Sequence, residues 1–143
     1  MKKLMIWLWL LLSVLYSSNL ESEIDRKIWK RIIFDLSLKE YRIYTIDRQL
    51  QDILCKIPGI TLVKDCTQAT LIIETRKTVV TDERCLEIPR LSNDYRLLVK
   101  NANEIGAFFW MKGRPTIILS KPRLERFGLK VDIELEDYLE DIE

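Results

Sequence analysis

The chain has 143 residues, of which 48% are hydrophobic and 31% are charged, a balance typical of one folded domain rather than a disordered segment. Its 23 Lys and Arg residues nearly balance its 22 Asp and Glu residues, and no basic block stands out, so nothing in the charge favours binding to nucleic acid. The chain has no His, which removes the usual general base and the commonest metal ligand, and we expect no enzyme, no metal and no cofactor.

The first eighteen residues have the pattern of an export signal. A basic start, Met1–Lys3, is followed by a thirteen-residue apolar run from Leu4 to Tyr16, and the small residues Ser17–Ser18 suit a cleavage site. Thirteen residues are fewer than the ~20 that a helix needs to span a bilayer. We therefore expect a signal peptide over residues 1–18, export to the periplasm, and a folded domain over residues 21–143. The alternative is an uncleaved anchor that holds the domain at the inner membrane, facing the periplasm.

Periodicity and composition predict the elements in the first half of this domain. A helix over residues 22–38 follows from apolar side chains that recur every fourth position, at Ile24, Ile28, Ile32 and Leu36. Asp47 is placed to cap a second, short helix over residues 48–56. β-Branched and aromatic residues predict strands over residues 41–46, 60–63 and 69–73. The apolar residues of the last strand run together, which indicates that it is covered on both faces.

The second half begins with a weaker strand signal. Cys85–Ile88 has strand composition and stops at Pro89, and Ser92 is placed to cap a helix that runs to Lys100. Near the end of the chain, apolar side chains three and four positions apart predict a terminal helix over residues 134–142.

A β-hairpin is the strongest pattern in the chain. Two apolar runs, Ala107–Met111 and Thr116–Leu119, are joined by a short turn that contains Gly113. The helix expected after it begins near Pro122 and ends at Gly128, which is placed as a C-cap. The strand–helix–strand order predicts a single three-layer α/β domain, with a central mixed sheet flanked by helices, ending in a β-hairpin followed by helices.

Three Cys in an exported chain suggest one disulfide and one free thiol. Cys66 and Cys85 both stand next to expected strands in polar surroundings, so this pair is favoured, while the spacings alone leave other pairings open. Cys55 lies near the inner face of an expected helix, where we expect a buried thiol that behaves as a small apolar side chain. The chain contains no CxxC, and the disulfide would be a structural link rather than a reaction centre.

The hairpin also offers the residues that we consider for contact with a partner. Phe108 and Trp110 are first of all candidates for the core, because large aromatic side chains are usually buried. Any exposed part of them, together with Lys112, Gly113 and Arg114 in the turn, would form a protein-binding surface. The other interpretations of the same turn are a solvated hairpin turn and a small cationic site for anions. We expect no catalytic residues and no metal ligands in the chain.

Two stretches resemble the YfiR-like family of small periplasmic proteins. One is Asp65–Ile73, in which a Cys precedes an apolar strand. The other follows the family's strand pair, short helix, Gly-Leu step and closing helix, at Gly106–Phe109, Ile117–Leu119, Leu124, Gly128–Leu129 and Leu135. The chain departs from the family at Ser120, where Asn is common, and it lacks the family's Trp-Pro near the first helix.

The resemblance implies a periplasmic regulator without catalytic activity, often dimeric. Such a protein binds the periplasmic sensor domain of an inner-membrane diguanylate cyclase and holds it inactive, so that it acts in cyclic di-GMP signalling. Family members can respond to redox state through a disulfide, which would give the Cys66–Cys85 pair a use. We expect contact with a membrane only through an uncleaved N-terminal segment. The alternatives are a small periplasmic solute-binding domain and, least favoured, a thiol-dependent enzyme that uses Cys55.

Overall fold

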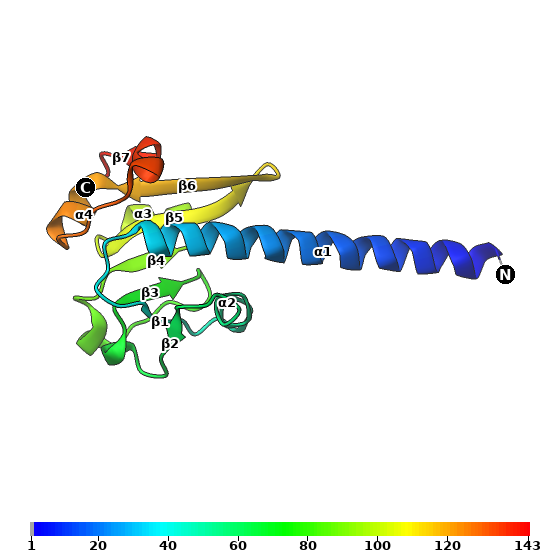
Figure 1. Cartoon of the computed structure of the whole chain (residues 1–143), viewed down its shortest axis with the longest axis horizontal. Coiled ribbons are helices and arrows are strands. Elements are labelled where there is room, and N and C mark those ends of the chain that lie inside the picture. The colour runs from blue at the N-terminus through cyan, green and yellow to red at the C-terminus, as the bar shows by residue number, and fades with distance from the viewer. Residues whose placement is uncertain (1) are drawn as a thin grey trace.

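A mixed sheet of seven strands runs through the centre of the computed structural model, in the order β2-β1-β3-β4-β5-β6-β7 (Figure 1). The first five strands in this order are parallel, β6 is antiparallel to β5, and β7 is parallel to β6. The strands are β1 (Arg42–Tyr44), β2 (Thr61–Leu62), β3 (Leu71–Glu74), β4 (Arg90–Ser92), β5 (Glu104–Met111), β6 (Arg114–Ser120) and β7 (Leu139–Glu140).

The structure describes residues 2–143, without the side chains of Lys2, Leu4 and residues 16–19. The expected cleavage site, which rests on the side chains of Ser17 and Ser18, therefore lies outside the described residues.

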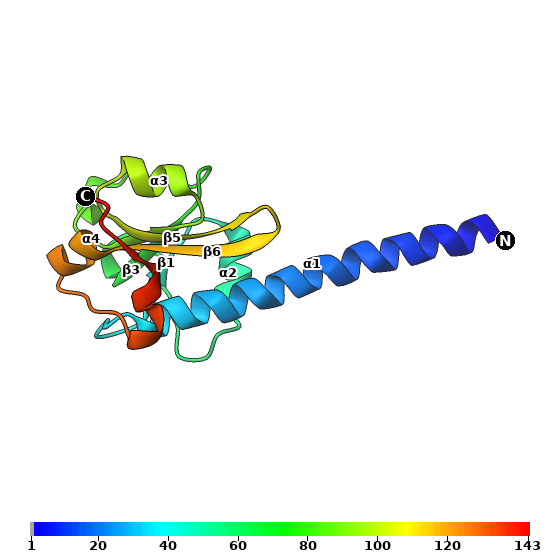
Figure 2. The same ribbon diagram turned by 90° about the horizontal axis from the view of Figure 1, so that it is seen from above.

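Helices cover both faces of the sheet. The long helix α1 (Lys2–Asp35) and α2 (Arg48–Leu54) lie against one face, and α3 (Tyr95–Lys100) lies on the other, as Figure 2 shows. The chain also forms α4 (Lys121–Arg126) after the hairpin, and 3₁₀ turns η1 (Cys66–Gln68), η2 (Glu83–Cys85) and η3 (Ile133–Tyr138). The expected α/β class, with a central mixed sheet between helices, is confirmed.

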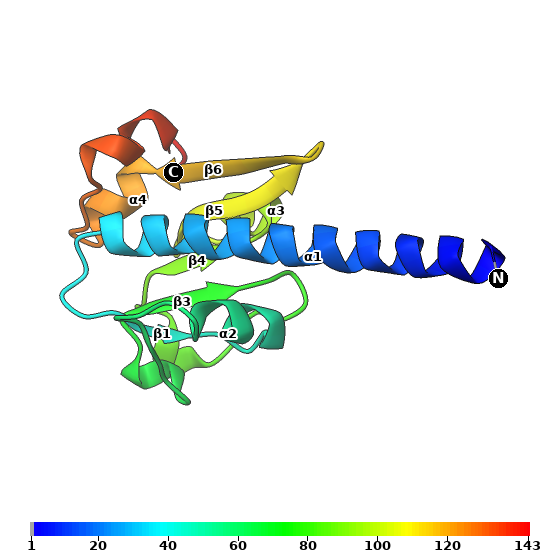
Figure 3. The same cartoon turned by 45° about the vertical axis from the view of Figure 1, so that its right-hand side comes forward.

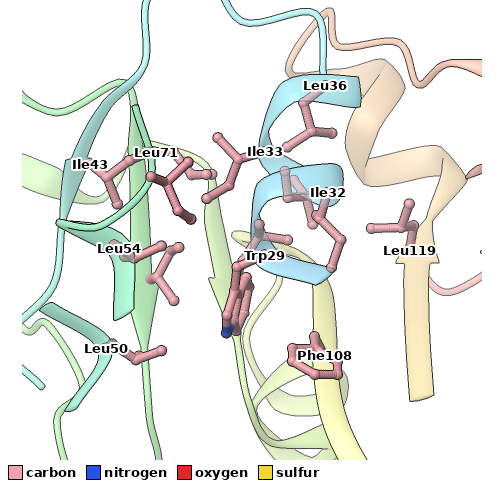
Figure 4. Close-up of a cluster of buried hydrophobic side chains, with 14 of the residues drawn as sticks. Trp29, Ile32, Ile33, Leu36, Ile43, Leu50, Leu54, Leu71, Phe108 and Leu119 are labelled. Carbon is pink, nitrogen blue, oxygen red and sulfur yellow. The ribbon is translucent and has the colours of Figure 1, made fainter. Parts of the chain in front are cut away.

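The main core lies between α1 and the sheet. The apolar spacing of α1 places Trp29, Ile32 and Ile33 on one face, Leu36 continues this face directly after the helix, and all four are at most 2% exposed (Figure 4). Trp29 packs edge-to-face on Phe108 of β5, with ring centroids 5.2 Å apart. Because burial of each such side chain contributes roughly 1.5–3 kcal/mol, this stripe is what fastens α1 to the sheet.

Strand β3 is buried on both sides, as its continuous apolar run predicts. Leu71 and Ile73 face the core under α1 and α2, while Ile72 faces a second, smaller cluster around Cys66 and Cys85. All four residues of the strand are buried, including Glu74.

The prediction for the fourth strand was wrong. Residues 83–85 form a 3₁₀ turn, and the strand β4 follows Pro89 instead of ending there. Pro89 has no N–H to give to the sheet, but its carbonyl accepts a hydrogen bond from the amide of Ile72 at 3.0 Å. The next helix is capped by Asp94, whose carboxylate accepts from the amide of Arg96 at 2.7 Å, whereas Ser92 is a buried residue of β4.

The two ends of the chain also differ from expectation. Helix α1 begins at Lys2 rather than Ser22 and ends at Asp35 rather than Leu38. The expected terminal helix is replaced by η3 and the short strand β7, which pairs with the end of β6. Main-chain pairing with a neighbouring strand overrides a helical spacing of apolar residues there, because the sheet satisfies the backbone groups directly.

Candidate functional site at the hairpin end

The first part of α1 projects beyond the domain as an apolar helix (Figure 1). We call residues 3–20 the projecting segment. Its described large apolar side chains between Met5 and Leu15 are 56–73% exposed, and they include Trp7 and Trp9. Among the described residues, no helix is both long enough and apolar enough to cross a membrane. The segment is therefore an exposed apolar surface that the fold itself does not cover.

The β5–β6 hairpin ends in a tight turn that points the same way as the projecting segment (Figure 3). Met111 pairs with Arg114, so the turn contains only Lys112 and Gly113. Both have positive φ, 50° and 74°, as a two-residue type I′ turn requires, and this matches the twist of the flanking strands. We call residues 110–114 the hairpin tip; all five are exposed.

The hairpin tip is fastened to α1 by one long-range contact. The Trp110 indole N–H donates to Oδ1 of Asp25 at 2.7 Å. Burial raises the pKa of Asp25, and the hydrogen bond from Trp110 offsets part of that rise. The contact fixes the position of the tip beside the point where α1 leaves the domain.

The structure separates the residues that the sequence offered as a partner surface. Phe108 is 3% exposed and belongs to the core against Trp29, so it does not contribute to a free surface. Trp110 is 36% exposed, and Lys112 and Arg114 are exposed at the tip. Met111, which is 55% exposed, belongs to the same surface. The sequence did not indicate this, because Met111 is the last residue of an apolar run that was expected to be a strand.

A small cleft of about 210 Å³ opens between α1, α2 and the end of β5. It lies at the carboxyl ends of the parallel strands, where ligands of open α/β sheets usually bind. Its walls include Trp29 and Trp110, and two carboxylates face it, from Asp25 and Asp47. The Asp47 side chain also caps α2, as predicted, by accepting from the amide of Leu50 at 2.9 Å.

A disulfide joins Cys66 to Cys85, the pair favoured from the sequence, with 6.0 Å between the Cα atoms. It links the two 3₁₀ turns over the second face of the sheet. A carboxylate oxygen of Asp82 lies within 4.8 Å of both sulfurs, but the sulfurs are bonded to each other and are not free to ligate a metal. Cys55 is exposed at the end of α2, which corrects the expectation of a buried thiol.

A buried cluster of charged side chains lies under the disulfide loops, and sequence reasoning missed it. Glu74, Arg90 and Glu104 are at most 1% exposed. Arg90 donates to Oε2 of Glu74 at 3.0 Å and to the carbonyl oxygens of Val80 at 2.6 Å and Cys85 at 3.3 Å. The guanidinium thus ties the loop that carries the disulfide to the sheet.

Burial disfavours the charged form of the second carboxyl group in this cluster, that of Glu104. Burial, then the hydrogen bond and the charge of Glu74, raise the pKa of Glu104 to about 10. Neither carboxyl oxygen of Glu104 nor Oε1 of Glu74 accepts a hydrogen bond from a donor in the described part of the chain, which favours the neutral, protonated form of Glu104. The sequence carries a partial signal: Glu74 and Glu104 each flank an apolar run, Leu71–Ile73 and Ile105–Met111, whereas Arg90 flanks none.

A second buried guanidinium, that of Arg123 in α4, holds main-chain oxygens rather than a carboxylate. It donates to the carbonyl oxygens of Leu98, Asn101 and Glu104, and to a main-chain oxygen of Glu143. The result is a link between α4, the start of β5 and the last residues of the chain.

No family model matches the chain, and no curated protein and no solved structure matches it either.

Proposed function

We propose that the chain is an exported, non-enzymatic regulatory protein that acts by contact with another protein. The hairpin tip is the observation that carries this proposal, because it is an exposed projection on a defined turn, fastened to α1 by the hydrogen bond from Trp110 to Asp25. Its Met111, Lys112 and Arg114 side chains offer apolar and cationic groups together. Preorganised surfaces of this kind lose little conformational entropy on binding.

Two further features support an extracytoplasmic protein. Disulfides such as Cys66–Cys85 form and persist in oxidising compartments, the bacterial periplasm among them. The N-terminal apolar run with its leading lysines suits an export signal or an uncleaved anchor. The resemblance to YfiR-like proteins suggests the partner: the periplasmic sensor domain of an inner-membrane diguanylate cyclase, held inactive by the complex.

Site-specific cross-linking in cells tests the proposal. A photoreactive amino acid replaces Lys112 at the hairpin tip, and a matched control carries it at Glu87, an exposed residue outside the hairpin. We expect the tip variant alone to capture an inner-membrane sensor or cyclase, and Arg114→Glu to reduce the yield and raise cellular cyclic di-GMP. Identical captures from both positions, with unchanged cyclic di-GMP, would argue against this function.

A small solute-binding role is the second candidate, and the cleft beside Trp29 and Trp110 favours it. Aromatic walls with a few converging polar groups are typical of ligand pockets. A solute that binds there should quench or shift tryptophan fluorescence and raise the melting temperature, and Asp25→Asn should weaken both effects. If a broad panel of solutes leaves fluorescence and melting unchanged, this role is excluded.

A further inference from the structure

The projecting segment and the hairpin tip protrude from the same end of the domain, and the described side chains of both are exposed. We infer that they dock together on a bilayer that contains anionic lipids, with the segment buried among the lipids and the tip resting on the phosphate headgroups. This inference goes beyond the proposed regulatory role, and because both involve the hairpin tip, it is tested on vesicles that contain no protein partner.

The apolar character of the segment points to lipid rather than to protein. Ten described large apolar side chains, from Met5 to Leu15, are each more than half exposed, and they lie on every side of the helix. A second helix or a protein groove covers one stripe of a helix, whereas a helix that is apolar all round needs a surrounding apolar medium. Trp7 and Trp9 are residues enriched where membranes meet water.

The hairpin tip reaches the level at which this apolar surface ends. Asp25 and Trp110 lie side by side because they share a hydrogen bond. From Asp25 back to Leu20 the helix rises about 7.5 Å, and from Trp110 to the turn the strand advances about 7–10 Å. By this estimate the tip lies at about the level of Leu20 along the helix axis, a few residues outside the apolar run; Figures 1 and 3 show the hairpin and the projecting segment running in the same direction.

Several cationic side chains lie at the level of the hairpin tip. Lys112 and Arg114 are exposed at the tip and form no ion pair within the described part of the chain. Arg76 and Lys77 are exposed in the loop that follows β3, at the same carboxyl edge of the parallel strands. Guanidinium and ammonium groups close to a membrane bind the phosphates of anionic lipids.

The acidic residues of α1 near this level do not cancel the attraction. Glu23 lies 3.9 Å from Arg26 and 3.7 Å from Lys27, so its charge is already partly balanced. Asp25 accepts the hydrogen bond from Trp110, which leaves Glu21 as the acidic group with no ion pair among the described residues. Preference for anionic lipid then rests on the tip and on the neighbouring loop.

Vesicle flotation of the full-length protein, purified in mild detergent and diluted into liposomes, tests the inference. Two vesicle types are compared, phosphatidylcholine alone and phosphatidylcholine mixed with phosphatidylglycerol. Leu8→Lys combined with Leu12→Lys should abolish binding to both types. Lys112→Glu combined with Arg114→Glu should weaken binding to the anionic vesicles by more than about tenfold and leave binding to the neutral ones unchanged.

The matched control is Lys39→Glu combined with Lys121→Glu. These substitutions reverse two exposed charges at the other end of the domain, where the parallel strands begin. It should bind both vesicle types like the parent protein, and high salt should remove only the preference for anionic lipid. Equal loss in the tip and control variants would overturn the role of the tip. Failure of the parent protein to float, dimers that form through the segment, or an intact mass that lacks the segment would overturn the docking itself.

Discussion

The substitution Glu104→Gln removes one titrating proton from the protein interior without removing the hydrogen bond it makes. Burial, then the hydrogen bond and charge of Glu74, raise the pKa of Glu104 to about 10 from an ordinary value of 4.5, so this carboxyl group stays protonated in the folded protein near neutral pH. A Gln amide can donate to Glu74 in the same place. We therefore expect the variant to have nearly the stability of the parent protein in mild acid.

The two proteins should differ as the pH rises. Between about pH 4.5 and 10 the folded parent protein retains a proton that the unfolded chain releases, so its stability is highest below this window and falls with pH. One proton corresponds to ~1.4 kcal/mol per pH unit, or about 2.7 kcal/mol between pH 6 and 8. The chain has no His, so few other groups titrate in this range.

Urea unfolding at a series of pH values measures the slope. The free energy of unfolding of the parent protein should fall with pH relative to that of Glu104→Gln, while Glu87→Gln, at an exposed site, should keep the parent slope. Parallel curves for the parent protein and Glu104→Gln would refute the raised pKa of Glu104. As a companion, Glu74→Gln removes the carboxylate that lies 3.0 Å from the Arg90 guanidinium and should cost about 3–5 kcal/mol in mild acid.

Three further substitutions test the packing by thermal and urea unfolding. Cys66→Ala with Cys85→Ala opens a loop with a sequence separation of 19 and should cost about 3 kcal/mol; an unchanged midpoint would show that the link does not limit the unfolded chain. Gly106→Ala places a Cβ 2.5 Å from a side-chain carbon of β6 and should cost about 1–3 kcal/mol, whereas Gly113→Asn should be tolerated; equal costs would contradict the close contact. Trp29→Ala should cost about 3–5 kcal/mol, and a loss below about 1 kcal/mol would mean that α1 is held elsewhere.

Features of the fold that depend on local signals could be predicted from the sequence. The hairpin is specified by two apolar runs and a Gly at a positive φ, and the start of α2 by the cap Asp47. The buried face of α1 follows from its four-residue repeat, and the α/β class follows from the order of strands and helices.

Features that depend on distant partners could not be predicted. Strand β4 forms because β3 and β5 accept it on either side, and β7 forms because the end of β6 is open to pairing. Taken singly, Glu74 and Arg90 would be predicted to lie on the surface, because charged residues usually do. The local sequence does not show that the two side chains form an ion pair in the interior. At the candidate surface, Phe108 and Trp110 lie two residues apart on the same face of β5, and only the position of α1 decides that Phe108 is buried while Trp110 stays partly exposed.

Helix α1 is continuous from the projecting segment into the core, and this has a geometric consequence for whatever holds the segment. Each residue of an α-helix turns the chain by about 100° and advances it by ~1.5 Å. One residue inserted between Leu20 and Trp29 would rotate the segment relative to the domain by more than a quarter turn, while a change in length of seven residues would nearly restore the original phase. Angular phase, and not distance alone, then sets which face of the domain is turned toward whatever holds the segment.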